Sequence, residues 1–525
     1  MKPITDKFWI RCYYLLVLVL CNYNYLGQSL SFSTVQGFFG VTMQDANWLL
    51  RGFHAGTIIT GIAGLVFIKW LGNRNLFIGA AITFLSATIF SFTANDFTTL
   101  LCSRIVAGIA NGFMIAVAMQ IFLSTFEGKT KTIGALYTVA TTIAGICLGI
   151  LSGSLFTEDF GWQFNYYLSV PPMIVLIVAA FFLVPVSQKQ EEIEDDWFSL
   201  IPFSILIISI LFAVMYRQEY EGLSNIRIVI ALIFALVSAA ILFIRGAVHP
   251  HPLFDTKLLQ YPSFVVAMVV SFFSGFVFVF AVSLLTKLLA GVLEMSMSDV
   301  FHFLNFLVLV IFASVIITFI LIALKANNYW LMIAALMLIA AAAAMFSKLN
   351  PEFSIDNIIL PSVMAMLGVG MVPLLVIAIA IKSVPPEYAS KVANFRSVAF
   401  AMGIAITAVD LGRAIDFRRV ENFNSMITYT DPGNPLLLER LNGLQSFYQS
   451  NGYDADEAYQ AAVNGVTGMV KLQAFFKAIN SMFITGIWVC LLIAFVLLAL
   501  WLKENHRMLL VFFSRKRTIN EPANT

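Results

Sequence analysis

Long apolar segments recur along almost the whole of this 525-residue chain, and they constrain its fold more than any other feature. A helix that crosses a lipid bilayer needs about 20 consecutive, mostly apolar residues. Segments of this kind lie near residues 12–33, 48–70, 75–93, 98–124, 132–157, 165–186, 197–216, 225–245, 262–287, 299–324, 328–347, 357–382, 392–413 and 479–502. The sequence therefore predicts an all-α membrane protein with about fourteen transmembrane helices.

The composition supports lipid as the solvent for most of the chain. Hydrophobic residues make up 60% of the sequence and charged residues only 11%, whereas soluble domains are about one quarter charged. The net charge of +2 gives no reason to expect a nucleic-acid partner. The five cysteines all lie in apolar segments without the spacing of metal ligands, so we expect neither a metal site nor a cofactor.

The positions of the basic residues predict the orientation. Lysine and arginine are concentrated in the two termini and in alternate loops, whereas the intervening loops hold few of them. Short cytoplasmic loops carry an excess of positive charge. The pattern therefore predicts a multi-pass protein of the inner (plasma) membrane with both termini in the cytoplasm. The basic residues of the alternate loops are Lys69, Arg74, Lys129, Lys131, Lys189, Arg245, Lys257, Lys325, Lys382 and Lys391.

One connection is much longer than the others. Residues 414–478 separate the last two apolar segments and contain two amphipathic stretches, 436–449 and 455–475. Amphipathic helices lie in the plane of the membrane surface. We expect a helical excursion at the outer surface, with an unstructured loop as the alternative.

A charged side chain inside one apolar segment is the first candidate for function. Arg104 lies in the segment 98–124, where a charge is costly unless it faces a cavity or a partner. Gly108 and Gly112 follow at a spacing of four residues, which permits close helix packing. An arginine that only holds helices together is the alternative interpretation.

A second glycine series suggests a seal between parts of the protein. Gly145, Gly149 and Gly153 recur every four residues in the segment 132–157. This spacing makes a smooth groove along one helix face, along which another helix can pack closely. We expect the groove to help close one side of the membrane, although ordinary small-residue packing would give the same pattern.

The order and spacing of these motifs and of several others resemble those of the major facilitator superfamily. Within it, they resemble those of the fourteen-span drug:proton antiporter branch (EmrB/QacA type). Each motif is weak alone, but together they extend over most of the chain. They are the Arg104-x-x-Ala107-Gly108-x-x-x-Gly112 motif, the glycine series from Gly145, Gly161-Trp162-Gln163-Phe164, His251-Pro252-Leu253-Phe254-Asp255, the pair Asn394 and Arg396, and the turn Asp431-Pro432-Gly433-Asn434-Pro435.

The resemblance implies a domain organisation and a function. It implies a six-helix bundle in residues 1–190, two inserted helices in 191–250, and a second six-helix bundle in 251–525 that includes the outer loop 414–478 and a cytoplasmic tail. Such a protein exports drugs or amphipathic small molecules by alternating access. Its partners would be the small-molecule substrate, protons or another ion, membrane lipid and, in a cell with two membranes, a periplasmic adaptor protein.

Departures from the branch bear on gating and on coupling. The loop after the second helix keeps only Gly72 and Arg74 of the family's gate motif, and Lys69 stands at its acidic position. Asn24 stands where the first helix of the branch carries the aspartate that takes the proton. Because an amide does not titrate, an uncoupled facilitator or importer on the same fold remains an alternative to the ion-driven exporter.

Several polar side chains are candidates for substrate binding or coupling. Asn24, Gln28 and Ser31 share one face of the predicted first helix, so they line the cavity or bond to neighbouring helices. His54 is a proton relay or an interfacial anchor. Asp410 lies one helical turn from Arg413 and is a proton site or half of a structural salt bridge. By the resemblance, Arg396 belongs to the same group.

A membrane-embedded enzyme or sensor is a third possible function, and the sequence argues against it. It shows no metal-ligand cluster, nucleophile motif or large soluble domain. The acidic run at 191–196 falls in the predicted linker before the inserted helices, where a solvated charge run is the simpler explanation. We therefore do not expect an enzyme.

Overall fold

The fold is built from α-helices. The computed structural model describes residues 7–25, 32–186, 196–217, 219–220, 222–350, 352–385, 388–427 and 434–519. The helices are α1 (Lys7–Tyr23), α2 (Phe32–Phe39), α3 (Met43–Leu71), α4 (Asn73–Phe92), α5 (Phe97–Ser124), α6 (Lys131–Phe160), α7 (Phe164–Tyr167), α8 (Val170–Leu183), α9 (Leu200–Tyr216), α10 (Ile226–Val248), α11 (Pro262–Gly291), α12 (Met297–Ala323), α13 (Asn328–Phe346), α14 (Asp356–Lys382), α15 (Ala389–Ile427), α16 (Pro435–Ser450) and α17 (Ala455–Ile519).

The number of membrane-spanning helices agrees with the sequence. Thirteen helices in the described residues are long and apolar enough to cross a membrane. The apolar helix α1 is shorter and packs beside α5 and α6, which makes fourteen in all. The prediction of an all-α membrane protein with about fourteen spans is confirmed.

The first helix begins and ends earlier than the predicted range 12–33. It ends at Tyr23, and Asn24 and Tyr25 form a turn in which the Tyr25 amide donates to the Asn22 carbonyl at 3.1 Å. The side-chain amides of Asn22 and Asn24 bond to carbonyls one turn back, at 2.6 and 3.3 Å. Such side-chain bonds compete with the helix backbone, which explains why a polar stretch ends the helix here.

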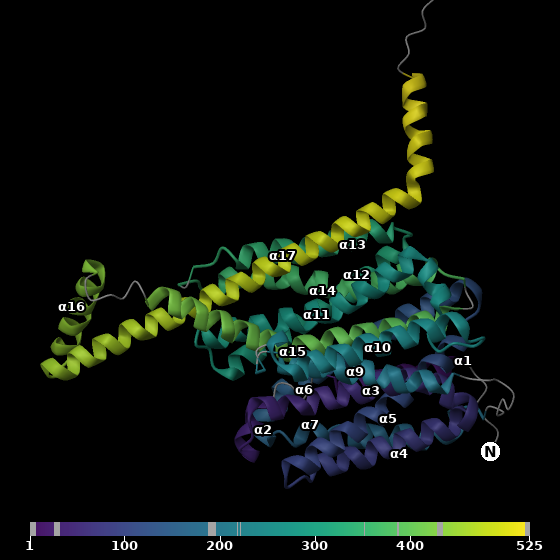
Figure 1. Ribbon diagram of the computed structural model, residues 1–525, viewed down its shortest axis with the longest axis horizontal. Coiled ribbons are helices and arrows are strands. Elements are labelled where there is room, and N and C mark those ends of the chain that lie inside the picture. The colour runs from purple at the N-terminus through teal and green to yellow at the C-terminus, as the bar shows by residue number, and fades with distance from the viewer. Residues whose placement is uncertain are drawn as a thin grey trace, which may run out of the picture.

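Two groups of helices lie side by side, with a helix pair between them (Figure 1). We call α1 and α3–α8 the first half, and α11–α15 with α17 the second half. The halves meet where α3 and α5 contact α15, and where α6 contacts α12 and α14. The pair α9 and α10 pack on each other, and α9 contacts both α3 and α15. This is the arrangement that the sequence resemblance implies, with two inserted helices between two bundles.

Capping side chains mark the N-termini of helices at the ends of the bundle. Thr42 and Asp45 form a capping box at α3, in which each side chain accepts from the other's backbone amide. Asp96 caps α5 by accepting from the Thr99 amide at 2.8 Å. The hydroxyl and amide of Thr99 both donate to this carboxylate, and they lower the pKa of Asp96. These caps bond backbone amides that would otherwise have no partner.

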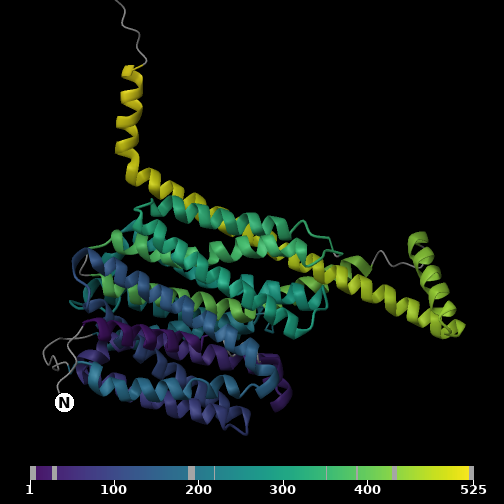
Figure 2. The same cartoon turned by 180° about the vertical axis from the view of Figure 1, so that it is seen from behind.

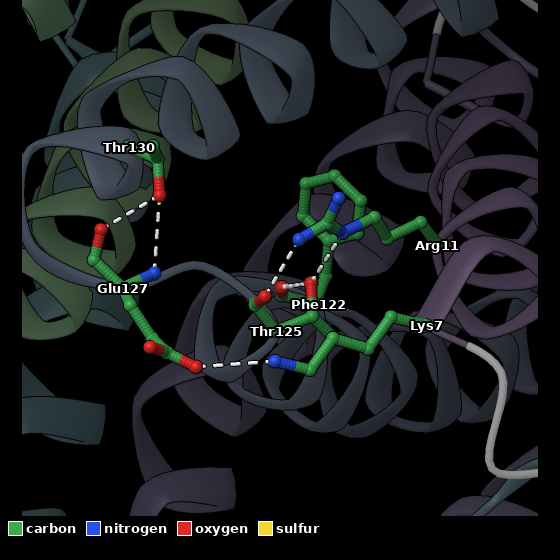
Figure 3. A network of polar contacts seen from close by, with 6 residues as sticks. All are labelled: Lys7, Arg11, Phe122, Thr125, Glu127 and Thr130. Atoms are coloured by element: carbon green, nitrogen blue, oxygen red, sulfur yellow. Dashed lines mark hydrogen bonds and ion pairs between the residues drawn. The ribbon is translucent and has the colours of Figure 1, made fainter.

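The start of α1 is fastened to the end of α5. The Arg11 guanidinium donates to the Thr125 hydroxyl at 3.0 Å and to its carbonyl at 2.6 Å (Figure 3). It also lies 4.0 Å from the centroid of the Phe126 ring. Lys7 and Glu127 form an exposed ion pair at 3.1 Å. A cation at the carbonyl end of a helix is favourable because it complements the helix dipole. We call the end of the molecule where α1 begins the basic end.

The inserted pair is joined by a buried ion pair. Arg245 of α10 contacts the Asp196 carboxylate, which precedes α9, at 2.5 Å, and the Ser199 hydroxyl also donates to it. Burial alone raises the pKa of Asp196, but the hydrogen bonds from Arg245 and Ser199 outweigh it, so the pKa is lowered. The carboxylate therefore stays charged, and holds α10, at all but acidic pH.

The long segment 414–478 is helical for most of its length. Helix α15 continues to Ile427, α16 follows, and α17 runs without a break from Ala455 into the bundle. The start of α17 and all of α16 extend past the end of the bundle opposite the basic end, which we call the hairpin end (Figures 1 and 2). The predicted helices are present, but they project away from the bundle instead of lying across its surface, because α17 continues the direction of its spanning part. Residues 428–433 lie outside the described residues.

Candidate functional site

A small polar cavity lies where the two halves meet. It measures ≈ 20 Å³, which is enough for about one water molecule. Helices α1, α5 and α6 of the first half and α15 of the second half form its walls. Its polar lining residues are Asn22, Tyr25, Thr138, Thr142, Arg396 and Ser397.

Arg396 places a buried charge in this cavity. Arg396 is 1% exposed, and one nitrogen of its guanidinium group donates to the Ser397 hydroxyl at 3.0 Å. Its Nε atom has no hydrogen bond to any residue that the structure describes. The Ser397 hydroxyl also contacts the sulfur of Met119 on α5 at 3.8 Å, so this part of α15 touches the first half. The predicted candidate Arg396 therefore lies at the boundary that alternating access would move.

Arg104 is buried in the first half. It is also 1% exposed. Its guanidinium carbon lies 4.3 Å from the ring centroid of Phe53 on α3 and 5.4 Å from that of Tyr166 on α7. These cation–π contacts stabilise the charge in part. Its Nε and Nη2 atoms make no hydrogen bond within the described part of the chain, so they can still donate to an acceptor.

Tyr25 connects the surroundings of the two arginines. Its ring lies 4.8 Å from the His54 ring and 6.1 Å from the Phe53 ring, and it also lines the cavity that contains Arg396. His54 is fully buried. The structure thus brings His54, Arg104 and Arg396 into one continuous cluster, although the sequence places them on three separate helices.

The sequence reasoning missed a polar residue in this region. Asn111 lies two helical turns after Arg104 on α5 and is 0% exposed. Both polar atoms of its amide lack a hydrogen-bond partner among the residues described. Positions 104, 111 and 115 share one helix face, and Ile115 lines the cavity. The seven-residue spacing from Arg104 was the signal that could have identified Asn111.

Other predicted site residues are placed differently or not at all. Asn24 is buried in the turn after α1 and is not on a continuous helical face. Gln28 and Ser31 lie outside the described residues. Asp410 lies in α15, but its side chain is outside the described part. Arg413 donates to the Met215 carbonyl of α9, so this arginine helps to attach the inserted pair.

The glycines in the Arg104 motif bring α5 against α3. A Cβ atom on Gly108 would lie 2.2 Å from the Phe53 carbonyl oxygen, and one on Gly112 would lie 2.1 Å from the Thr60 hydroxyl. Thr57 and Thr60 donate to α5 carbonyls at 3.1 and 2.7 Å across the same contact. The two helices are in backbone contact here because neither glycine has a side chain.

The second glycine series makes a different contact from the one expected. A Cβ atom on Gly145 would lie 2.4 Å from the Val19 carbonyl oxygen, so Gly145 packs on α1 of its own half. Gly149 and Gly153 are buried on the same helix. One contact of α6 with the second half is made by Tyr137, whose ring centroid lies 5.4 Å from that of Phe319 on α12. Gly145 therefore does not itself form a seal between halves.

The remnant of the gate motif is a turn at the basic end. Gly72 connects α3 to α4 with φ of 80°, which an L side chain adopts only with strain. Arg74 donates to the Phe181 carbonyl of α8 and lies over the Phe181 ring at 5.9 Å. Both of these contacts lie within the first half.

Comparisons with known proteins identify similar transporters. Among curated proteins, the multidrug transporter protein MdtP of Bacillus subtilis (strain 168) is 22% identical over 375 residues, which cover 68% of this chain and 67% of MdtP. The multidrug export protein EmrB of Escherichia coli (strain K12) is 21% identical over 263 residues, which cover 49% of this chain and 51% of EmrB. The chain matches only about half the length of EmrB and of other relatives.

The fold also resembles solved transporters. A bacterial homolog of the human lysosomal transporter Spinster, in an inward-facing and unoccupied conformation, superposes with a TM-score of 0.56 at 14% identity, covering 94% of this chain and 96% of that one. A D-xylose–proton symporter gives a TM-score of 0.54 at 12% identity, with 78% and 90% covered. At these identities the likeness shows the fold alone. The model of the Major Facilitator Superfamily matches residues 14–408, which is more than half of the sequence, and the chain therefore belongs to that superfamily.

Proposed function

We propose that this protein is a secondary active transporter that exports amphipathic small molecules carrying an anionic group. The observation that carries the proposal is the pair of buried arginines, Arg104 within the first half and Arg396 at the boundary between the halves, whose guanidinium groups keep donors that bond to none of the described residues. Planar guanidinium groups bind carboxylate, sulfonate or phosphate groups with two parallel hydrogen bonds.

The buried charges of the protein favour a substrate that carries a negative charge. Arg104 and Arg396 are buried in the spanning helices. Among the side chains that the structure describes, the buried carboxylate is Asp196, which belongs to Arg245 at the basic end. A buried charge is costly unless a partner compensates it. An anionic cargo would supply that partner at the cluster, and the rings of Phe53 and Tyr166 would contact its apolar part.

The direction of transport rests on the orientation and on the relatives. The basic end, with Arg11, Lys69 and Arg74, would face the cytoplasm by the positive-inside rule. MdtP and EmrB are named as a multidrug transporter and a multidrug export protein. Export from the cytoplasm through an inner membrane is consistent with both. The periplasmic adaptor implied by the sequence resemblance would meet the chain at the hairpin end, where α16 projects.

An ion gradient would drive the export. His54 is a buried imidazole that contacts Tyr25 within the cluster, and imidazole is a side chain that can take up and release a proton. Export against an inward proton gradient requires the two ligands to alternate. His54 would take up a proton from the outer side only after the anion has left, and would release it to the cytoplasm before the next anion binds.

Uptake by inside-out membrane vesicles tests this function. The amphipathic anion 8-anilinonaphthalene-1-sulfonate should accumulate in energised vesicles that contain the protein, but not in vesicles from cells without it. The cation ethidium, at the same concentration, should accumulate at least about tenfold more slowly, because a buried guanidinium disfavours a like charge. A preference for ethidium would contradict the anionic substrate class.

The same vesicles distinguish coupled export from facilitation. An uncoupler should abolish accumulation, and the His54→Asn variant should retain downhill flux but lose accumulation. Asn24 is the feature that favours the alternative, because it is buried near the end of α1 and cannot titrate. Equal flux with and without the uncoupler would identify an uncoupled facilitator.

A further inference from the structure

A second cavity lies inside the second half, away from the boundary between the halves. Side chains from α11, α13, α14, α15 and α17 line this cavity, which measures ≈ 180 Å³. None of its lining residues lines the cavity that contains Arg396. The two cavities are therefore separate potential binding sites.

Aromatic rings form much of the wall of this second cavity. Phe276 and Phe280 of α11 stack at 5.6 Å between centroids and 23° between planes. Phe346 of α13 and Phe483 of α17 stack at 4.7 Å and 13°. All four rings line the cavity. Aromatic rings contribute offset-stacked or edge-to-face contacts to a further ring, in addition to the burial of apolar area.

The wall offers no partner for a charge. Its lining residues are apolar except for Thr485 and Cys490. The Thr485 hydroxyl already donates to the Ser481 carbonyl at 2.9 Å, and Cys490 is a free, buried thiol that behaves as a small apolar group. A charged or strongly polar ligand would lose its hydration here without compensation.

We propose that this cavity binds an uncharged aromatic ring of about the size of benzene. An engineered apolar cavity of about 150 Å³ in another protein binds benzene, and the volume here is similar. The exposed Thr485 and the neighbouring Gly486 lie at the rim of the cavity. An apolar molecule dissolved in the bilayer therefore reaches the site from the side of the bundle, without passing through the cavity between the halves.

Two positions on one helix give a matched pair of variants. Ala343 lines the cavity and is 8% exposed, so Ala343→Leu fills it. Ala341 lies on the exposed face of the same helix, so Ala341→Leu adds the same atoms elsewhere. Gly486→Val is a second filling variant, because a Cβ there meets Phe280 at 3.6 Å, an ordinary contact distance.

The binding test uses the full chain in lipid nanodiscs with methionine methyl groups labelled for NMR. Met482 lines the cavity, so the ring current of bound benzene should shift its methyl resonance saturably. The half-saturating benzene concentration should rise at least about tenfold in Ala343→Leu and in Gly486→Val, but stay within about twofold in Ala341→Leu. A linear shift that is equal in all proteins would mean partitioning into lipid only and would overturn the site. Displacement of benzene by an equal concentration of n-hexane would also overturn it, because it would identify a site for lipid acyl chains.

Discussion

Replacing Arg104 by alanine is expected to lower the rate of anion export about 100-fold while the protein still inserts into the membrane. Losing one partner of a buried charged pair costs about 2–5 kcal/mol, and 1.36 kcal/mol corresponds to a tenfold change in rate. Insertion should not suffer, because the change removes a charge from an apolar helix. The measurement is the initial rate of 8-anilinonaphthalene-1-sulfonate uptake, divided by the amount of protein in the membrane.

Two further variants control this result. Arg104→Lys keeps the charge but loses the planar fork, so its rate should be intermediate. Arg227→Ala removes an exposed arginine that bonds to Tyr220 at 3.0 Å beside the inserted pair, and its rate should equal that of the unaltered protein. If Arg104→Ala exported the dye at the normal rate, Arg104 would be a structural residue only.

Adding a methyl group at Gly108 is expected to destabilise the first half severely. The new Cβ would lie 2.2 Å from the Phe53 carbonyl oxygen and 2.7 Å from its Cα, both backbone atoms that cannot rotate away. Separating α3 from α5 would cost about 1–3 kcal/mol or more. We expect Gly108→Ala to lower the melting temperature in detergent by several degrees and to reduce the yield of folded protein.

Gly79→Ala is the matched control for this change. It adds the same methyl group to the neighbouring spanning helix α4, where nothing lies within 4 Å of the new Cβ. Its melting temperature should be unchanged or slightly higher, since alanine is the better helix former. Equal melting temperatures for Gly108→Ala and Gly79→Ala would show that the contact between α3 and α5 yields without cost.

The spanning helices were predictable because lipid imposes a simple rule. Each span must satisfy its own backbone hydrogen bonds and present apolar side chains, so length and hydrophobicity reveal it directly. Arg104 was predictable for the converse reason, since a charge in such a segment has to be compensated. Gly108 and Gly112 followed from their spacing, although only the structure shows that α3 is their partner.

Other features depend on contacts that no local pattern records. Gly145 meets α1 and not the second half, and the helical spacing alone does not name the helix that fills the groove. The first helix ends at Tyr23 because asparagine side chains bond back to its carbonyls, a choice that hydrophobicity does not reveal. The cluster brings together Tyr25 and Arg396, which are far apart in the sequence, so only the tertiary structure reveals it.

Locking the two halves together tests the central claim most directly. Tyr137 and Phe319 face each other across the boundary at 5.4 Å, whereas Phe92 and Tyr167 are 5.7 Å apart within the first half. Each pair would be changed to cysteine in a protein whose five native cysteines are replaced, and joined by a short bismaleimide in proteoliposomes. Alternating access predicts that the Tyr137→Cys/Phe319→Cys link stops dye transport and that the Phe92→Cys/Tyr167→Cys link leaves it intact. Undiminished transport with the two halves joined would contradict the account.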